Sequence, residues 1–120
     1  MNLDHIRQTL IDEIGLKPQE ASLYLLVTTE GRMSPEEIAR RLDMSSTSCT
    51  ELCDRMVDLG AFIMMPHWYE ATHPRFAAVR MYRQICTSRG EVPGRSKAAD
   101  GVGAALEDAY DAARTKYIGR

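Results

Sequence analysis

Residues 32–62, RMSPEEIARRLDMSSTSCTELCDRMVDLGAF, decide the fold. Ser34 followed by Pro35 is typical of a helix start, because serine accepts a hydrogen bond from a free amide and proline fits the first helical position. Glu37 would complete a capping box with Ser34. A second start follows the short turn LDMS, with Ser45 or Ser46 as its cap. The stretch therefore predicts two helices joined by a tight turn.

The second of these helices has one continuous apolar side and ends at Gly60, since glycine accepts the conformation that closes a helix. The apolar positions follow helical spacing. They are Cys49, Leu52, Cys53, Met56 and Leu59. The opposite side begins with SSTSCT and carries a single cation, Arg55.

The surrounding sequence supplies further elements. Apolar spacing predicts a helix over residues 3–14, and Pro18 begins another that Gly31 closes. Residues 61–73 contain two short runs around a proline turn, which predicts a small hairpin. Pro74 begins a fifth helix. Its inward side is expected to carry Phe76, Val79, Tyr82, Ile85 and Cys86.

This order predicts a mainly α protein with a small β-hairpin wing, that is, a winged helix-turn-helix. We expect residues 1–87 to form that domain, 88–97 a Gly/Pro-punctuated linker, and 98–120 a last helix. The apolar side of the last helix approximates a coiled-coil seam. It is formed by Val102, Leu106, Ala109, Ala113 and Tyr117.

A lone helix cannot bury such a seam unaided. We expect a homodimer in which the last helix, together with the first, meets its two-fold mate. The alternative is that the last helix packs on its own domain, against the first helix.

The composition limits the class of protein to which the chain can belong. The chain has 120 residues, 44% hydrophobic and 27% charged, which is typical of one globular domain. It contains neither an apolar run of the roughly 20 residues that span a bilayer nor an export signal, so we expect a cytoplasmic protein without membrane contact. Its three cysteines are then expected as thiols.

Charge is unevenly distributed. Residues 1–74 hold six Lys/Arg against twelve Asp/Glu, whereas residues 75–97 hold six Lys/Arg against one Glu. A basic stretch can form a phosphate-binding surface, and it can equally be a solvated helix face and loop. The charge pattern alone leaves both interpretations open.

Four pieces of sequence resemble the winged-helix domain of the TrmB-like archaeal transcription regulators. They are IGLKPQEASLYLLV, MSPEEIARRLDMS, DLGAFIMM and WYEATHPRFAAVRMY, within residues 14–82. The last piece is the most specific. In that family the second strand of a short wing typically reads Tyr-x-Ala and is followed at once by a helix that begins with proline. The span STSCTELCDRMVDLG is also similar to the recognition helix of MarR-like regulators.

The resemblance implies a dimeric DNA-binding regulator, but these residues resemble only its winged-helix domain, so we do not expect a sugar effector. Both families commonly place Arg or Lys where this chain has Ser46, Thr47, Ser48 and Glu51. Glu51, Asp54 and Asp58 would oppose phosphate. The alternative function is therefore a winged-helix protein–protein interaction module whose acidic recognition face meets a basic protein partner.

We expect double-stranded DNA to be contacted by the helix over residues 45–59 and by its neighbours. The expected contacts are Ser45, Ser46, Thr47, Ser48, Thr50 and Arg55, with Arg40, Arg41, His67 and Arg75 around them. Hydroxyls can bond bases or phosphates, and a helix N-terminus attracts phosphate by itself.

Other candidate sites favour structural roles. Cys49 and Cys53 could offer two thiolates to a metal, but their place on the apolar side favours burial. Cys86 is a better candidate for a redox-sensitive thiol. Trp68 could wedge against a sugar, although packing on its own domain is favoured. No catalytic motif, metal-ligand pattern or cofactor-binding loop is present, so the chain is not expected to be an enzyme.

Overall fold

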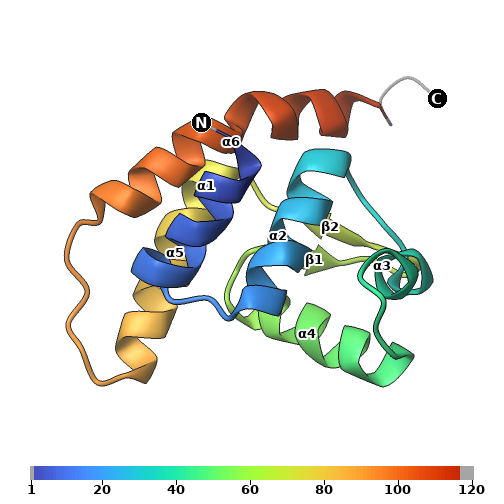
Figure 1. Ribbon diagram of the computed structural model, residues 1–120, viewed down its shortest axis with the longest axis horizontal. Helices are drawn as coiled ribbons and strands as arrows, with labels where there is room; N and C mark the ends of the chain where they lie inside the picture. Colours follow the sequence, from blue (N-terminus) through green and yellow to red (C-terminus); the bar gives the residue numbers. More distant parts are fainter. Residues whose placement is uncertain (1, 117–120) are drawn as a thin grey trace.

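The computed structural model describes residues 2–116 (Figure 1). The elements in chain order are α1 (Leu3–Thr9), η1 (Leu10–Ile14), α2 (Pro18–Glu30), α3 (Pro35–Arg41), α4 (Ser46–Asp58), β1 (Phe62–Met64), β2 (Tyr69–Ala71), α5 (Pro74–Ser88) and α6 (Lys97–Thr115). The short π-helical segment η1 continues α1. The protein is mainly helical with a small antiparallel hairpin, which confirms the winged helix-turn-helix.

The two helix starts in the opening stretch are confirmed. The Ser34 hydroxyl accepts a hydrogen bond from the Glu37 amide (3.1 Å), and the Ser45 hydroxyl accepts one from the Ser48 amide (3.1 Å). The Glu37 carboxylate accepts from the Arg40 guanidinium and makes no bond to the Ser34 amide, so the capping box is only half formed. Asp43 turns the chain between the helices with a left-handed φ of 52°, which aspartate tolerates better than most residues.

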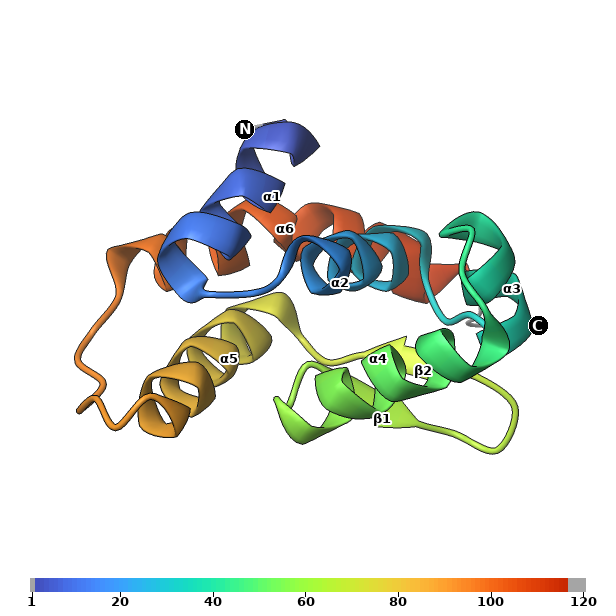
Figure 2. The same ribbon diagram turned by 60° about the horizontal axis from the view of Figure 1, so that its bottom comes forward.

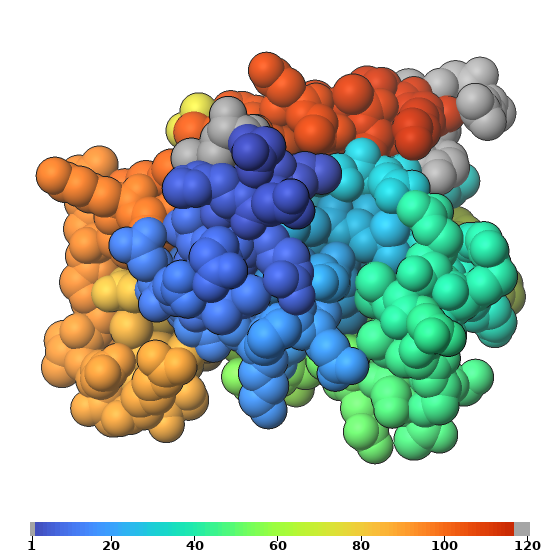
Figure 3. Space-filling model, in the orientation of Figure 1, coloured from blue at the N-terminus to red at the C-terminus, as the bar shows by residue number. Residues whose placement is uncertain are grey.

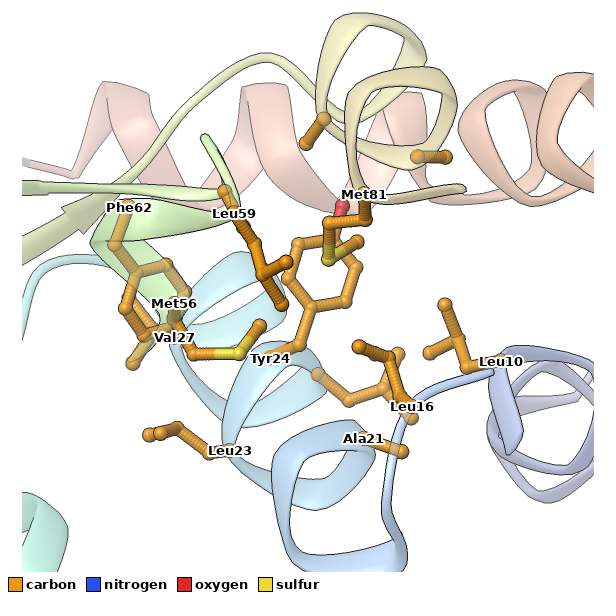
Figure 4. Close-up of a cluster of buried hydrophobic side chains, with 14 of the residues drawn as sticks. Leu10, Leu16, Ala21, Leu23, Tyr24, Val27, Met56, Leu59, Phe62 and Met81 are labelled. Atoms are coloured by element: carbon orange, nitrogen blue, oxygen red, sulfur yellow. The ribbon is translucent and has the colours of Figure 1, made fainter. Parts of the chain in front are cut away.

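The core gathers around Tyr24, which lies at the centre of the close-up in Figure 4. Met56 and Leu59 of α4 and Met81 of α5 surround it, and its ring stacks on Phe62 with centroids 6.4 Å apart. All these side chains are buried, and they come from α2, from α4 and its C-cap residue, from β1 and from α5. The core therefore fixes α4 and the hairpin relative to α2.

The hairpin is short and well anchored. Phe62 faces Ala71 across the two strands, and Met64 faces Tyr69. Met33, just before α3, adds a third short strand segment, because its amide and carbonyl both bond Tyr69 (3.1 and 2.9 Å). The wing thereby begins from a fixed base beside α3.

The last helix packs on its own domain. α6 crosses α5 and also lies along α2 and η1 (Figures 1 and 2). Gly103 permits the crossing, because a Cβ there would come within 2.6 Å of the Arg75 Cα. Three residues of the expected dimer seam are buried in this contact, and Ala109 is partly buried. The three are Val102, Leu106 and Ala113.

This packing corrects the expectation that the seam meets a second protomer, because its apolar side chains already lie inside the core. It corresponds to the alternative stated for the last helix, with α5 and α2 as the main partners and α1 as a lesser one. Tyr117 lies outside the described residues. Homodimerisation itself stays a prediction.

The expected inward side of α5 was partly wrong. Phe76 is 54% exposed, whereas Ala77, Ala78 and Met81 are fully buried. Ile85 and Cys86 are buried as expected. Because α6 approaches the backbone at the start of α5 so closely, small side chains suit the shared side better than a phenylalanine ring.

Candidate nucleic-acid interface

The first turn of α4 presents hydroxyl groups to solvent. Ser45, Ser46, Thr47, Ser48 and Thr50 are all exposed. Some of these hydroxyls support the turn: Ser45 donates to the Ser48 hydroxyl (3.0 Å), and Thr50 donates to the Ser46 carbonyl (3.0 Å). Within residues 2–116 the hydroxyls of Ser46 and Thr47 make no hydrogen bond. They stand beside free helix amides whose dipole favours an anion.

The second half of α4 is tied to the rest of the domain. The Arg55 guanidinium lies 3.4 Å from the carboxylate of Glu20, a residue only 3% exposed. The Tyr69 hydroxyl donates to the Asp54 carboxylate (3.3 Å), which joins α4 to the wing. Glu51 and Asp58 remain on the exposed side. A DNA contact by Arg55 stays a prediction, but its charge already compensates a buried carboxylate.

The other predicted arginines also have carboxylate partners. Arg40 pairs with Glu37, Arg41 with Glu30 (2.6 Å) and Arg75 with Glu107 (2.9 Å). The hydrogen bond from Arg75 lowers the pKa of the Glu107 carboxyl. Exposed ion pairs of this kind contribute only about 0–1 kcal/mol, so a phosphate could replace the carboxylate. The three arginines stay predicted contacts.

Sequence reasoning selected only Arg75 from the basic fifth helix, and the structure adds two cations from it. Arg80 and Arg83 are exposed, and neither forms an ion pair within the described part of the chain. Arg80 lies over the Phe76 ring (5.6 Å) and along Gly60, directly after α4. The signal was present as the charge excess of residues 75–97, but the sequence alone could not show which arginines lie beside α4.

The helices that carry these groups lie on one side of the molecule. Figure 2 shows α4 and α5 on the same side of the molecule, with the loop between β1 and β2 projecting beyond the start of α4. The space-filling view in Figure 3 shows a different face of the molecule. On that face α1, α2 and α3 lie in front, and α4 is visible only along the lower edge. The exposed hydroxyl turn therefore lies beside the wing loop, whereas α5 lies at the opposite end of α4, where Arg80 runs along Gly60.

The wing contributes one exposed candidate, His67. Its neighbour Trp68 is held on the domain, because Arg32 stacks over its ring (4.3 Å) and its indole N–H donates to Glu70 (2.8 Å). The packing role favoured for Trp68 is thus confirmed. His67 stays a predicted contact.

Cys49 and Cys53 are confirmed as core residues, since both are 0% exposed. The Cys49 thiol donates to the Pro35 carbonyl (3.3 Å), which links α4 to α3. Burial raises the pKa of the Cys53 thiol, which disfavours the thiolate that a metal or an oxidant requires. Cys86 is also buried, at 8% exposure. Among residues 2–116, no cluster of three or more His, Cys, Asp or Glu side chains is arranged to hold a metal ion.

Comparison with known protein families gives one match. Residues 22–61 match the family described as "Winged helix-turn-helix DNA-binding", which covers 40 of the 120 residues. The matched segment contains most of α2 and all of α3 and α4, and it ends one residue before β1. No curated protein and no solved structure matches the chain.

The match supports a DNA-binding regulator, a class that is typically non-enzymatic. The finer resemblance to TrmB-like proteins stays a prediction. Within residues 2–116, no helix is both long and apolar enough to cross a membrane.

Proposed function

We propose that this protein is a homodimeric, cytoplasmic transcriptional regulator that inserts the first turn of α4 into the major groove of DNA. The observation that carries the proposal is the exposed hydroxyl turn at Ser46 and Thr47. This turn lies within the segment that matches a winged helix-turn-helix DNA-binding family. In such motifs the N-terminal residues of the second helix contact base edges.

The charges around α4 indicate how affinity and specificity would be divided. The turn holds no arginine that could form a bidentate contact with guanine. Each such contact contributes about 1–3 kcal/mol of discrimination against the wrong base. Affinity would come instead from phosphate contacts by the helix amides and by flanking cations such as Arg80 and Arg83. We therefore expect modest sequence discrimination and a strong dependence on salt.

The test introduces two negative charges at the proposed contact. Replacing both Ser46 and Thr47 by glutamate should weaken binding to duplex DNA by more than about 100-fold, because two carboxylates would face phosphate. Glutamate near a helix N-terminus stabilises the helix, so loss of the fold would not explain the result. Binding would be measured by fluorescence anisotropy with genomic DNA fragments.

The matched control places the same two charges on the far side of the molecule. Ala104 and Ala105 are exposed on α6, away from α4 (Figure 1). Replacing both by glutamate should change DNA affinity by no more than about threefold, the size expected of a distant surface charge. If S46E/T47E binds DNA like wild type, the first turn of α4 is not the DNA-contacting surface.

Helix-turn-helix proteins commonly bind as dimers to two DNA half-sites about 34 Å apart, one for each recognition helix. Homodimerisation is therefore part of the proposal. Since the α6 seam is buried, the interface would use the exposed side of α1. Leu3, 49% exposed on α1, offers apolar area there. Light scattering at micromolar concentration should give twice the 13.5 kDa mass of the chain, and Leu3→Glu should reduce it. A wild-type monomer under these conditions would exclude this assembly.

A protein–protein interaction module is the second candidate. Glu51 and Asp58 are exposed on α4, and the cations at Arg40, Arg41 and Arg55 are paired with carboxylates, which leaves an acidic second half. This function predicts that a basic peptide binds α4 and that DNA does not. Competition separates the two: a DNA duplex that fails to bind at low salt, together with lysine-rich peptide binding lost in Glu51→Lys, would favour the module.

A further inference from the structure

The tip of the wing exposes a run of large apolar side chains. Ile63, Met64 and Met65 are all exposed, and Met64 is the most exposed of the three at 64%. Residues 61–69 contain no Lys, Arg, Asp or Glu. Contiguous exposed apolar groups on a folded domain mark a surface that meets a partner. The tip therefore offers a partner apolar contact, whereas the cations of the domain lie elsewhere.

The tip is held in a fixed shape. The Met65 amide donates to the Trp68 carbonyl (2.8 Å) across the turn, and Pro66 restricts the backbone between them. Trp68 is anchored below the turn by the bond from its indole N–H to Glu70 (2.8 Å). An apolar group on such a turn can enter a partner with little loss of backbone freedom, which favours binding.

The register of the hairpin places Met64 on the α4 side of the wing. Met64 lies opposite Tyr69, and opposite residues of an antiparallel pair share a face. The Tyr69 hydroxyl donates to Asp54 of α4, so Met64 continues the α4-facing side of the wing toward its tip. Figure 2 shows the loop between β1 and β2 projecting beyond the start of α4, where the hydroxyl turn lies.

These features suit the minor groove of DNA. With the hydroxyl turn of α4 in a major groove, the projecting tip beside it would reach the adjacent minor groove. Proteins that kink DNA from this groove insert apolar side chains, methionine among them, between neighbouring base pairs. A rigid tip that has an exposed methionine and no arginine or lysine for phosphate fits that role.

We propose that Met64 enters the minor groove as a wedge between two base pairs and kinks the duplex. The wedge rests on the proposed function, since the wing reaches this groove only if α4 binds DNA. Pyrimidine–purine steps such as TA unstack easily, whereas A-tracts are stiff. The wedge would therefore supply sequence preference through DNA deformability, which the arginine-free turn of α4 supplies only weakly through base contacts. The preferred partner is a duplex with TA steps beside the α4 contact.

The experiment compares two duplexes of about 30 base pairs built only from A·T pairs, one with repeated TA steps and one an A-tract. Both present the same acceptors in the minor groove, so stiffness is what separates them there. Fluorescence anisotropy reports binding, energy transfer between dyes at the two ends reports bending, and 2-aminopurine in place of one adenine reports unstacking. The full-length wild type should bind the TA duplex at least about threefold more tightly, kink it by about 20–90° and raise the 2-aminopurine fluorescence.

Two variants of the wedge and one control locate the effect. Met64→Ala should reduce the kink below about 20° and abolish the preference for TA steps, whereas Met64→Leu keeps an apolar wedge and should bend DNA like wild type. Neither should change the salt dependence of binding, since no charge is removed. The matched control is Val92→Ala, which should also bend DNA like wild type. Val92 is 96% exposed in the linker between α5 and α6, at the opposite end of the molecule from the hairpin (Figure 1).

The outcomes separate the wedge from the proposed function. Binding without bending by the wild type, or an undiminished kink in M64A, would overturn the wedge and leave DNA binding by α4 standing. Absence of binding to either duplex would overturn both. A lower mass of M64A in light scattering, together with an undiminished kink, would show instead that Met64 contacts a second copy of the chain.

Discussion

The two halves of α4 differ in what they do for the molecule. The first half presents the hydroxyls of Ser46 and Thr47 to solvent on one side, and on its other side only the buried Cys49 thiol bonds α3, at the Pro35 carbonyl. The second half is joined to α2 by Arg55 and to the wing by Asp54, and its buried side holds Met56 in the core. One end of the helix is available to a partner, and the other positions it.

The comparison teaches why the charge of a recognition helix cannot be judged from composition alone. The single arginine of α4 belongs to the positioning half, where it compensates a carboxylate that is only 3% exposed. Arg80 and Arg83, which are exposed and in no ion pair within residues 2–116, lie outside the helix, on α5. Variants of the two halves should accordingly separate stability from DNA binding.

The largest effect on stability is expected from Arg55→Leu. Glu20 would lose its ion-pair partner while remaining buried, although it would keep its hydrogen bond to the Lys17 amide (2.9 Å). We expect the free energy of unfolding to fall by about 1–2 kcal/mol, less than for a fully buried pair because Arg55 is partly exposed. Urea denaturation measures it, with Arg95→Leu as an exposed control.

DNA affinity of folded R55L should change by no more than about threefold, since the guanidinium is already engaged. Unchanged stability together with a large loss of DNA binding would reverse the assignment of Arg55 to the positioning half.

The cations beside α4 are expected to control salt dependence. Replacing both Arg80 and Arg83 by glutamine should reduce the slope of log affinity against log salt by about 1.8 for each bound protomer, because each lost phosphate contact contributes about 0.9. The comparison variant is Arg40→Gln with Arg41→Gln, two predicted contacts for which we expect a smaller slope change because their guanidinium groups are paired with Glu37 and Glu30. A larger slope change in that variant would place the phosphate-binding surface beside α3.

A smaller effect is expected in the core of the second half. Cys53→Ala removes one buried sulfur and should lower the free energy of unfolding by about 1 kcal/mol, because a small void remains. The raised pKa of this thiol also predicts slow labelling at pH 8, since little thiolate forms. Fast labelling of Cys53 in the native protein, or one bound zinc ion per chain, would show that it is not structural.

Local signals in the sequence predicted the fold well. Ser34, Ser45 and Gly15 define helix ends through short-range hydrogen bonds and backbone conformation, so their effect is visible in the sequence itself. Glu37 shows the limit of such signals, because its carboxylate pairs with Arg40, three residues on, and not with the Ser34 amide as expected.

Contacts between distant segments could not be predicted in this way. Arg55 is separated from Glu20 by 35 residues, and Arg75 from Glu107 by 32. The exposure of Phe76 depends on where α6 crosses α5, which no spacing within α5 reveals. The seam of α6 was correctly identified as apolar, but its periodicity does not distinguish burial in its own domain from burial against a second copy.

The central claim is that DNA meets the first half of α4 and not the second. Chemical-shift mapping of the ¹⁵N-labelled full-length chain with a random-sequence duplex at low salt tests it directly. The account predicts the largest shifts at the amides of residues 46–50, smaller ones near His67, Arg80 and Arg83, and little change over residues 54–58 and 97–116. Shifts centred on the second half of α4 or on α6, or no shifts at all, would contradict it.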